Sequence, residues 1–269
     1  MRSGLSLHAK AADGEEGRRL LGTGSSISEG LRLEIWALSP GGSRIADFEA
    51  SESLVVLLGG RCDLAVLGGP GWRSLGGRPD VFSGAATSIY LPPGARVEVS
   101  TRDGVEMAVV SAPAEPGGEA YRIGPEEVTR ETRGEGSWQR EVQTILDASR
   151  PAQRLLVGET YNPPGAWSSY PPHKHDQHRP PEESRLQEVY HYRFQPERGF
   201  GIQRVYSPER GLDELLLVED GDTVLIPFGY HPVVAAPGYR LYYLWALAGD
   251  DREMRLHEDP DHAWVARPA

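Results

Sequence analysis

The feature that most limits the possible folds is the division of the chain into short apolar runs by glycine and proline. The 269 residues include 32 glycines and 22 prolines, which favour short strands joined by turns over long helices. Apolar runs of strand length, bounded by these residues, cover 32–38, 54–58, 62–67 and 105–110. We therefore expect an all-β protein with little helix.

A strand that ends in a proline–glycine corner occurs twice. Residues 88–95 read Ser-Ile-Tyr-Leu-Pro-Pro-Gly-Ala, and residues 226–229 read Ile-Pro-Phe-Gly. This internal repeat suggests two barrels of the same type. The organisation that we expect has four parts, which are an N-terminal segment (1–30), an N-terminal barrel (31–113), a linker (114–150) and a C-terminal barrel (151–269).

The linker is rich in glutamate, glycine and arginine, and its second half carries a different pattern. Apolar residues at Trp138, Val142, Ile145 and Leu146 have helical spacing. The pattern predicts a short helix between the two barrels.

Two histidines, His173 and His175, follow a pair of prolines. On an extended strand the side chains of residues i and i+2 share a face, so both imidazoles point one way and Lys174 points the other way. Two imidazoles on one face can bind one metal ion. Downstream, residues 187–194 alternate with Glu188 and Tyr190 on one face, and a later corner is followed by His231.

A His-x-His strand, a glutamate on the next strand and a histidine after a Gly-x5-Pro-x-Gly corner resemble the ligand order of the cupin barrel. The resemblance implies a bicupin, with two antiparallel double-stranded β-helices. It also implies a divalent cation bound by His173, His175, Glu188 and His231. The spacer before Glu188 is longer than in most cupins, because residues 178–185 add a loop rich in proline and charge. No histidine lies between Leu31 and Pro113, so the first barrel is expected to bind no metal.

The chain further resembles the 5-deoxy-glucuronate isomerase family of inositol catabolism, which is related to the 5-keto-4-deoxyuronate isomerases. Trp245 departs from the pattern, because a small polar residue is expected there, and it could change the substrate. The residues that carry the resemblance are Gly158–Tyr161, Pro164–Gly165, Trp167–Asp176, Gly229–Pro232, Tyr242–Leu244, Ala248–Gly249, His262–Trp264, Leu75–Phe82 and Tyr90–Pro92.

The family resemblance implies an aldose–ketose isomerase that converts 5-deoxy-D-glucuronate to 5-dehydro-2-deoxy-D-gluconate. A divalent cation would polarise the carbonyl and stabilise an enediolate, and Glu188 would transfer the proton, with Glu159 as a second option. Zinc, manganese, iron and nickel all suit the ligand set, and zinc or manganese is favoured. Tyr190 is a candidate to contact a sugar hydroxyl.

The substrate's carboxylate needs a cation, because a guanidinium binds a carboxylate through two hydrogen bonds. Arg204, on the strand after Glu188, is preferred to Arg140. Arg133 and Arg193 are weaker candidates. Lys174 is a further substrate-binding candidate, although a surface or supporting charge is the simpler interpretation of its place on the opposite face.

Charge and composition narrow the partners. The formal net charge of −11 argues against a nucleic acid, which needs a basic surface. No run of residues has the length of a membrane span or a signal peptide, and the single cysteine, Cys62, excludes an internal disulfide. We expect a cytoplasmic protein that forms a homo-oligomer through its N-terminal barrel.

Two other function classes stay open on the sequence. The same ligands could bind Fe(II) in an oxygenase, or the barrel could be a non-catalytic sugar-binding module. An anaerobic assay separates the isomerase from the oxygenase. Metal analysis separates an enzyme from a binding module.

Overall fold

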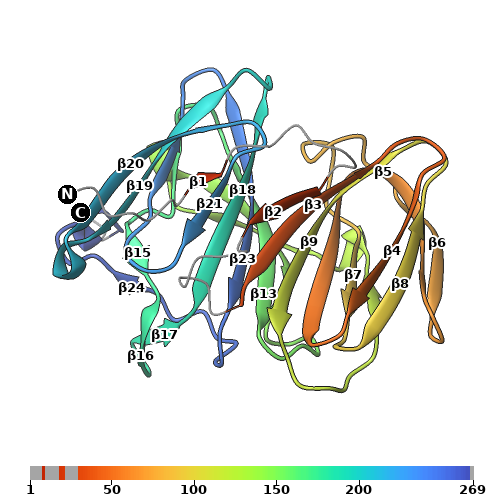
Figure 1. Ribbon diagram of the computed structural model, residues 1–269. Helices are drawn as coiled ribbons and strands as arrows, with labels where there is room; N and C mark the ends of the chain where they lie inside the picture. Colours follow the sequence, from red (N-terminus) through yellow and green to blue (C-terminus); the bar gives the residue numbers. More distant parts are fainter. Residues whose placement is uncertain (1–7, 10–17, 22–29, 267–269) are drawn as a thin grey trace. The chain divides into compact units, whose positions relative to one another are not determined.

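The computed structural model describes residues 8–9, 18–21 and 30–266 (Figure 1). Almost all regular structure in these residues is strand. No helix among them is long and apolar enough to cross a membrane. The helical elements are single 3-10 turns: η2 (Pro125–Glu127), η3 (Gly136–Trp138), η4 (Pro208–Arg210) and η5 (Ala263–Ala266).

The chain forms two compact units. The N-terminal unit contains Ala11–Thr129 together with Thr144–Val157. The C-terminal unit contains Arg130–Gln143 and the chain from Gly158 onward, and it includes the short strand β1 (His8–Ala9). The predicted linker is therefore divided between the two units. Apart from β1, β2 and Gly30, the predicted N-terminal segment lies outside the described residues.

The long strand β5 (Ser51–Val66) organises the N-terminal unit. Its pairing with β9 shifts register between Leu57 and Gly59, and Gly60 has a φ of 87°, which a residue without a Cβ adopts readily. The predicted runs 54–58 and 62–67 therefore form one strand that continues through this irregularity. The main sheet has the order β10-β7-β5-β9-β3-β2, and β5 also pairs with β6 and β8. The other strands of this unit are β2 (Arg18–Leu21), β3 (Arg32–Leu38), β4 (Ser43–Phe48), β6 (Gly71–Gly76), β7 (Ser88–Leu91), β8 (Ala95–Ser100), β9 (Val105–Pro113) and β10 (Tyr121–Ile123).

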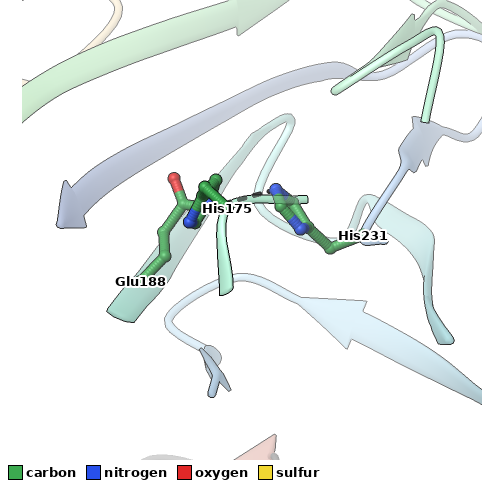
Figure 2. A group of neighbouring side chains, drawn as sticks. All are labelled: His175, Glu188 and His231. Carbon is green, nitrogen blue, oxygen red and sulfur yellow. Dashed lines mark hydrogen bonds and ion pairs between the residues drawn. The ribbon is translucent and has the colours of Figure 1, made fainter. Parts of the chain in front are cut away.

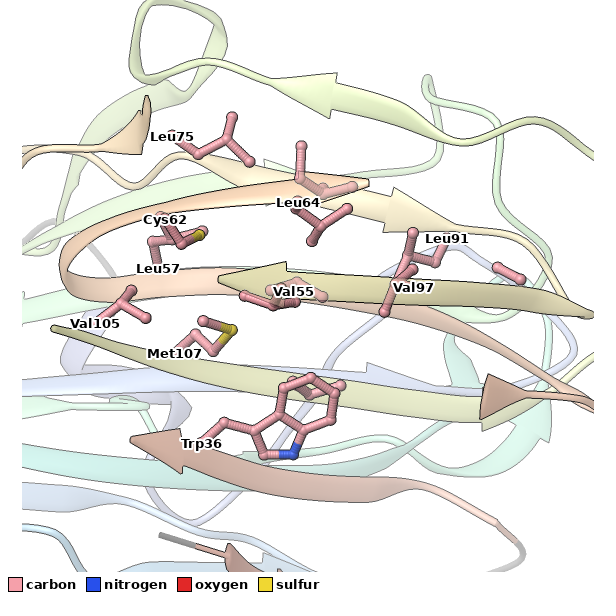
Figure 3. Packing of buried hydrophobic residues seen from close by; sticks show 14 of the residues in the cluster. Trp36, Val55, Leu57, Cys62, Leu64, Leu75, Leu91, Val97, Val105 and Met107 are labelled. Atoms are coloured by element: carbon pink, nitrogen blue, oxygen red, sulfur yellow. The ribbon is translucent and has the colours of Figure 1, made fainter. Parts of the chain in front are cut away.

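The interior of the N-terminal unit is apolar. Side chains from its strands form one cluster (Figure 3), in which Val55, Leu57, Met107 and Leu91 are almost completely buried. Cys62 belongs to this cluster and is a free thiol. Burial of such aliphatic side chains stabilises a fold by roughly 1.5–3 kcal/mol each, so this unit is held by ordinary hydrophobic packing.

The C-terminal unit contains most of a seven-stranded sheet of order β1-β21-β18-β23-β13-β12-β11 and a four-stranded sheet of order β14-β22-β19-β20. Two small ribbons, β15-β24 and β16-β17, complete it. The strands are β11 (Thr129–Arg133), β12 (Arg140–Leu146), β13 (Leu155–Asn162), β14 (Trp167–Ser168), β15 (His173–Lys174), β16 (Asp176–Arg179), β17 (Glu183–Arg185), β18 (Gln187–Gln195), β19 (Phe200–Ser207), β20 (Leu212–Glu219), β21 (Thr223–Ile226), β22 (Val233–Ala235), β23 (Arg240–Ala248) and β24 (His257–Glu258).

The predicted linker helix is wrong. Residues 140–146 form the strand β12, and only Gly136–Trp138 make a single 3-10 turn. Val142, Thr144 and Ile145 are β-branched and suit a strand. The neighbouring strands β11 and β13 supply hydrogen-bond partners that a sequence pattern does not reveal.

The all-β prediction is confirmed, because almost all regular structure in the described residues is strand. No sheet closes on itself in the part of the chain that the structure describes.

Candidate metal centre

Three of the four predicted ligands converge in the C-terminal unit (Figure 2). His175 follows β15, Glu188 lies on β18, and His231 comes after the corner at Gly229. Their candidate ligand atoms lie within 4.8 Å of one another, and all three residues are buried. Oε2 of Glu188 is 3.1 Å from Nε2 of His175 and 3.1 Å from Nε2 of His231. The alternation predicted from the sequence therefore directs these side chains to one point.

The backbone orients the imidazoles. Nδ1 of His175 lies 3.0 Å from the carbonyl of Leu186, and Nδ1 of His231 lies 2.9 Å from the carbonyl of Gly229. Donation from Nδ1–H to a carbonyl leaves Nε2 as the free lone pair, which is the arrangement of metal-binding histidines. Nε2 of His231 is buried and makes no hydrogen bond, as a nitrogen that awaits a cation would.

His173 lies beside this group without joining its tight cluster. Its ring centroid is 5.0 Å from that of His231 and 6.4 Å from that of His175. Nδ1 of His173 is 3.3 Å from the carbonyl of Pro171, so its other nitrogen is available in the same way. His173 therefore lies beside the cluster, as a fourth ligand of the same cation would.

The three imidazoles and the carboxylate influence one another's charge. Burial raises the pKa of Glu188, but the neighbouring His175 and His231 outweigh burial and lower this pKa to about 2. Burial, together with His231 and His175, holds the pKa of His173 well below its usual value. The group thus presents one carboxylate and a neutral His173 imidazole, which are the ligand forms that a divalent cation requires.

A buried ionic network supports the two ligand segments. Nζ of Lys174 donates to Asp176 at 2.7 Å and to Glu183 at 2.8 Å, so Lys174 points away from the imidazoles as predicted and does not line the cavity. Oδ2 of Asp176 accepts from the backbone N–H of Gly229 at 2.9 Å. Asp176 therefore connects the segment that carries His175 to the corner that delivers His231.

Glu183 anchors the loop that lengthens the spacer before Glu188. It is fully buried, and besides Lys174 it accepts hydrogen bonds from the backbone of Asp176 and Gln177 and from the side chain of Arg179. His178 in the same loop is exposed and pairs with Asp251. The added loop is thus fixed by a buried carboxylate and leaves the ligand geometry intact.

A cavity of about 290 Å³ opens beside the metal-ligand group. His173 and Glu188 form part of its wall, and Arg140 and Tyr190 form another part. It is also lined by the large apolar side chains of Trp138, Val142, Trp245, Met254 and Leu256 and by the hydroxyl-bearing residues Thr160, Ser169, Tyr170 and Tyr243.

Arg140 is the principal cation of this cavity. It is 9 % exposed, and its Nη1 donates to the carbonyl of Trp138 at 3.2 Å. No described carboxylate lies within ion-pair distance of it, and burial lowers its pKa. A buried guanidinium without a counter-ion is costly unless an anion joins it. Arg133 also lines the cavity, but it is partly exposed and bonded to Glu131.

Arg204 is not at this cavity, in contrast to the preference from the sequence. Its guanidinium makes two hydrogen bonds to the exposed Asp213, at 2.7 and 2.9 Å. On β19 Gly201, Gln203 and Val205 are buried, whereas Phe200 and Ile202, which alternate with them as Arg204 does, are exposed. Arg204 therefore belongs to the outer face. Its ordering ahead of Arg140 is therefore corrected.

Two tyrosines, Tyr190 and Tyr243, line the cavity. The hydroxyl of Tyr190 is 2.8 Å from that of Ser169, and its ring centroid is 4.4 Å from that of Tyr243. Burial, together with Glu188 and Tyr243, raises the pKa of Tyr190 well above its usual value. Tyr190 thus stays protonated and serves as a hydrogen-bond donor. Tyr192 donates to Gln203 in the interior.

The second proposed base, Glu159, points elsewhere. It is fully buried and accepts hydrogen bonds from Tyr242 and Tyr161 at 2.8 and 3.0 Å, and it does not line the cavity.

Glu258 does line the cavity, although the acidic pair Glu258–Asp259 suggested a solvated surface. It pairs across the β15-β24 ribbon with His173, so the two side chains share a face. The sequence gives no signal for this pairing, because β24 is only two residues long.

Comparison with known proteins supports one family. The model of the KduI/IolB family matches residues 7–265. The 5-deoxy-glucuronate isomerase of Geobacillus kaustophilus is 43 % identical over 93 % of this chain and 91 % of its own length. The enzyme of the same name from Bacillus subtilis is 35 % identical over 87 % of each chain.

Solved structures agree with this assignment. An IolB-like protein from Salmonella typhimurium LT2 superposes with a TM-score of 0.93 at 35 % identity, covering 98 % of this chain and all of the other. Oxalate decarboxylase from Bacillus subtilis superposes with a TM-score of 0.66 at 15 % identity, covering 94 % of this chain and 79 % of the other. The latter similarity concerns the cupin fold alone.

Proposed function

This chain belongs to the KduI/IolB family, and from that premise we propose that it isomerises 5-deoxy-D-glucuronate to 5-dehydro-2-deoxy-D-gluconate in inositol catabolism. The reaction moves one hydrogen from C2 to C1 and one proton from the C2 hydroxyl to the C1 oxygen. Atoms and electrons balance without an oxidant. The relatives that carry this name are isomerases, which supports an intramolecular oxidoreductase.

The observation that carries the proposal is the pairing of a cation-binding group with a separate buried arginine in one cavity. The substrate has a carbonyl at one end and a carboxylate at the other. Glu188 and His173 line the cavity at the metal-ligand group, and Arg140 lines the same cavity without an acidic partner among the described residues. An arginine–carboxylate pair is bidentate and selective, so the acid end would bind at Arg140.

His173, His175, Glu188 and His231 would hold the metal. Three imidazoles and a carboxylate suit zinc or manganese, and iron or nickel also fit. When bound, the cation would polarise the substrate carbonyl and stabilise negative charge on its oxygen. The unbonded Nε2 of buried His231 supports this assignment.

The protein supplies the proton transfer. The cavity offers two carboxylates, Glu188 and Glu258. Glu188 has an oxygen between two imidazoles and is the ligand, so transfer between C2 and C1 falls to Glu258 at the adjacent wall. Tyr190 remains protonated and would donate a hydrogen bond to a substrate hydroxyl.

Several broader features belong to the same proposal. Each unit would be one barrel of a bicupin, which the similarity to oxalate decarboxylase favours. The enzyme would work in the cytoplasm, where a buried free cysteine stays reduced. It would form a homo-oligomer through the N-terminal unit, which contributes no lining residue to the cavity described above.

Incubation with 5-deoxy-glucuronate in deuterium oxide under anaerobic conditions tests the function. The isomerase should form the ketose without oxygen and should incorporate solvent deuterium at C1. The Glu258→Gln variant should keep its metal and lose about 10²–10⁴-fold in kcat.

Two results would contradict the proposal. A requirement for oxygen would indicate an oxygenase instead. A protein that holds its metal but converts no sugar acid would indicate a binding module. Full activity of Glu258→Gln would return the proton transfer to Glu188.

A further inference from the structure

Trp245 occupies an unusual place in the seven-stranded sheet. It lies on β23 directly opposite Tyr190 of β18, and it is 5 % exposed. On its other side β23 adjoins β13. A Cβ atom at Gly158 of β13 would lie 2.2 Å from Cζ2 and 2.6 Å from Cε2 of Trp245. The benzene ring of the indole therefore fills the space that a side chain at position 158 would need.

The indole belongs to the strand between β18, which carries Glu188 and Tyr190, and the strands that lead to Arg140. Across the sheet the order is β18, β23, β13, β12. Tyr190 lies opposite Trp245, and a Cβ at Gly158 would also lie 2.4 Å from the carbonyl oxygen of Gln143 on β12. Arg140 is three residues from Gln143 on that strand. Tyr190, Trp245 and Arg140 all line the cavity. Because Gly158 has no side chain, Trp245 covers the strand between the metal-ligand side and the arginine side.

Carbon-rich side chains make up much of this part of the wall, and Thr160 on β13 adds a hydroxyl to it. Val142 lies two residues from Arg140 on the same strand and lines the cavity with Trp138 and Trp245. The ring of Trp138 lies under the guanidinium of Arg140, with 5.8 Å from Cζ to the ring centroid. A substrate whose carboxylate is bound at Arg140 places its adjacent carbon against this wall.

We propose that Trp245 is a specificity-determining residue that selects substrates with no hydroxyl on the carbon next to the carboxylate. The inference rests on the proposed function, and it deepens it by assigning the discrimination between 5-deoxy-glucuronate and glucuronate. A methylene group packs on the indole, whereas a hydroxyl group there loses its water without a new partner. An apolar wall rejects an added hydroxyl only moderately, by about 10²-fold.

The test measures kcat/KM for 5-deoxy-glucuronate and for glucuronate with the metal-loaded enzyme and its Trp245→Phe and Trp245→Ser variants. The parent should prefer the deoxy acid by about 10²-fold. Phenylalanine keeps an apolar ring and should preserve most of this ratio, whereas serine should lower it by about tenfold or more. Both acids are measured on one preparation, so loss of folded or metal-bound enzyme cancels in the ratio.

The outcomes distinguish a failure of the proposed function from a failure of the role assigned to Trp245. A parent that isomerises neither acid contradicts the proposed function, and this inference falls with it. A parent that isomerises the deoxy acid but shows the same ratio in Trp245→Ser overturns the role of Trp245 alone. If Trp245→Ser does not fold, Trp245→Tyr replaces it, since its hydroxyl adds a polar group to the ring, and an unchanged ratio there overturns the inference equally.

Discussion

Two buried glutamates, one in each unit, show how differently the same side chain can be used. Glu52 in the N-terminal unit accepts hydrogen bonds from the hydroxyl of Tyr90 at 2.7 Å and from three successive backbone N–H groups, those of Gln153, Arg154 and Leu155, at 2.6–2.8 Å. Glu188 in the C-terminal unit instead directs one oxygen at two imidazoles.

The difference lies in the partners and not in the burial, which is 0 % exposure for Glu52 and 4 % for Glu188. Ordinary donors satisfy Glu52, and the core of its unit is an apolar cluster. Glu188 has one oxygen 3.1 Å from Nε2 of both His175 and His231, and Nε2 of His231 makes no hydrogen bond. A buried carboxylate beside two imidazole nitrogens is a ligand set that suits a divalent cation.

The largest effect is expected from removing a ligand. His175→Ala should weaken metal binding by more than 10²-fold and abolish isomerisation, because the loss of a mere supporting group costs about 10–100-fold. Metal content after dialysis and the isomerase assay measure this. His178→Ala, in the exposed loop, is the matched control and should keep both. Full metal content in His175→Ala would show that Glu188 and its two histidines do not form a metal site, and Glu188 would then not differ from Glu52 in this way.

Arg140→Ala should come next. A charge-assisted bond to a carboxylate is worth about 1.5–3 kcal/mol, so KM for the sugar acid should rise about 10- to 150-fold. Inhibition by a neutral sugar of the same shape should change little. Arg204→Ala, whose guanidinium is bound to exposed Asp213, is the control. Equal effects of the two substitutions would show that Arg140 does not bind the acid.

Asp176→Asn tests how the C-terminal unit holds its metal-binding histidines in place. Asparagine has only one acceptor oxygen, so it cannot serve both Lys174 and the N–H of Gly229. We expect metal affinity to fall on the order of tenfold, as measured by competition with a chelator. Asp213→Asn, at an exposed position of β20, should leave the affinity unchanged. Parent-like affinity in Asp176→Asn would mean that the corner holds His231 without this bond.

Glu52→Gln should change stability and leave the site alone. The amide NH₂ would face a backbone N–H, at a cost of about 1–3 kcal/mol for an unsatisfied buried donor. Urea unfolding measures this loss, while the metal affinity of the folded protein should match the parent. Glu98→Gln on an exposed position of β8 should shift stability by less than about 0.5 kcal/mol. A loss of metal affinity in folded Glu52→Gln would contradict the conclusion that Glu52 supports the fold and not the metal site.

The smallest effect concerns acid pH. Burial alone would raise the pKa of Glu183, but Arg179 and Lys174 outweigh it and lower this pKa from 4.5 to about 2. A carboxylate with a depressed pKa in the folded protein stabilises it above pH 4.5, and this contribution is lost as the pH falls toward 2. Urea midpoints at several pH values should fall less steeply in Glu183→Gln. Parallel curves would show that Glu183 does not titrate in this way.

The sequence predicted the site where local alternation decides the geometry. The spacing of His173 and His175 and the parity of Glu188 and Tyr190 depend only on an extended strand, and the corner at Gly229 delivers His231 without long-range information. The strand at 32–38 was predicted with the bounds of β3 for the same reason.

The rest depends on partners that are distant in the chain. The helical spacing at Trp138–Leu146 concealed a strand that its neighbours stabilise, and Arg140 lies on that strand. On β19 the exposed Phe200 and Ile202 share a face with Arg204, so apolar character gave no guide to the buried side. Glu258 reaches the cavity through a two-residue strand that no pattern identifies.

The bond between Asp176 and Gly229 has a consequence for how the protein is made and maintained. His175 and His231 are brought together only after the intervening strands β16 to β21 have folded, so the unfolded chain has no comparable chelating site. A cation then binds the native state selectively and adds free energy that grows as RT ln(1 + [M]/Kd). Cells short of the metal would therefore hold an enzyme whose C-terminal unit is the more labile part, and proteolysis during starvation should begin there.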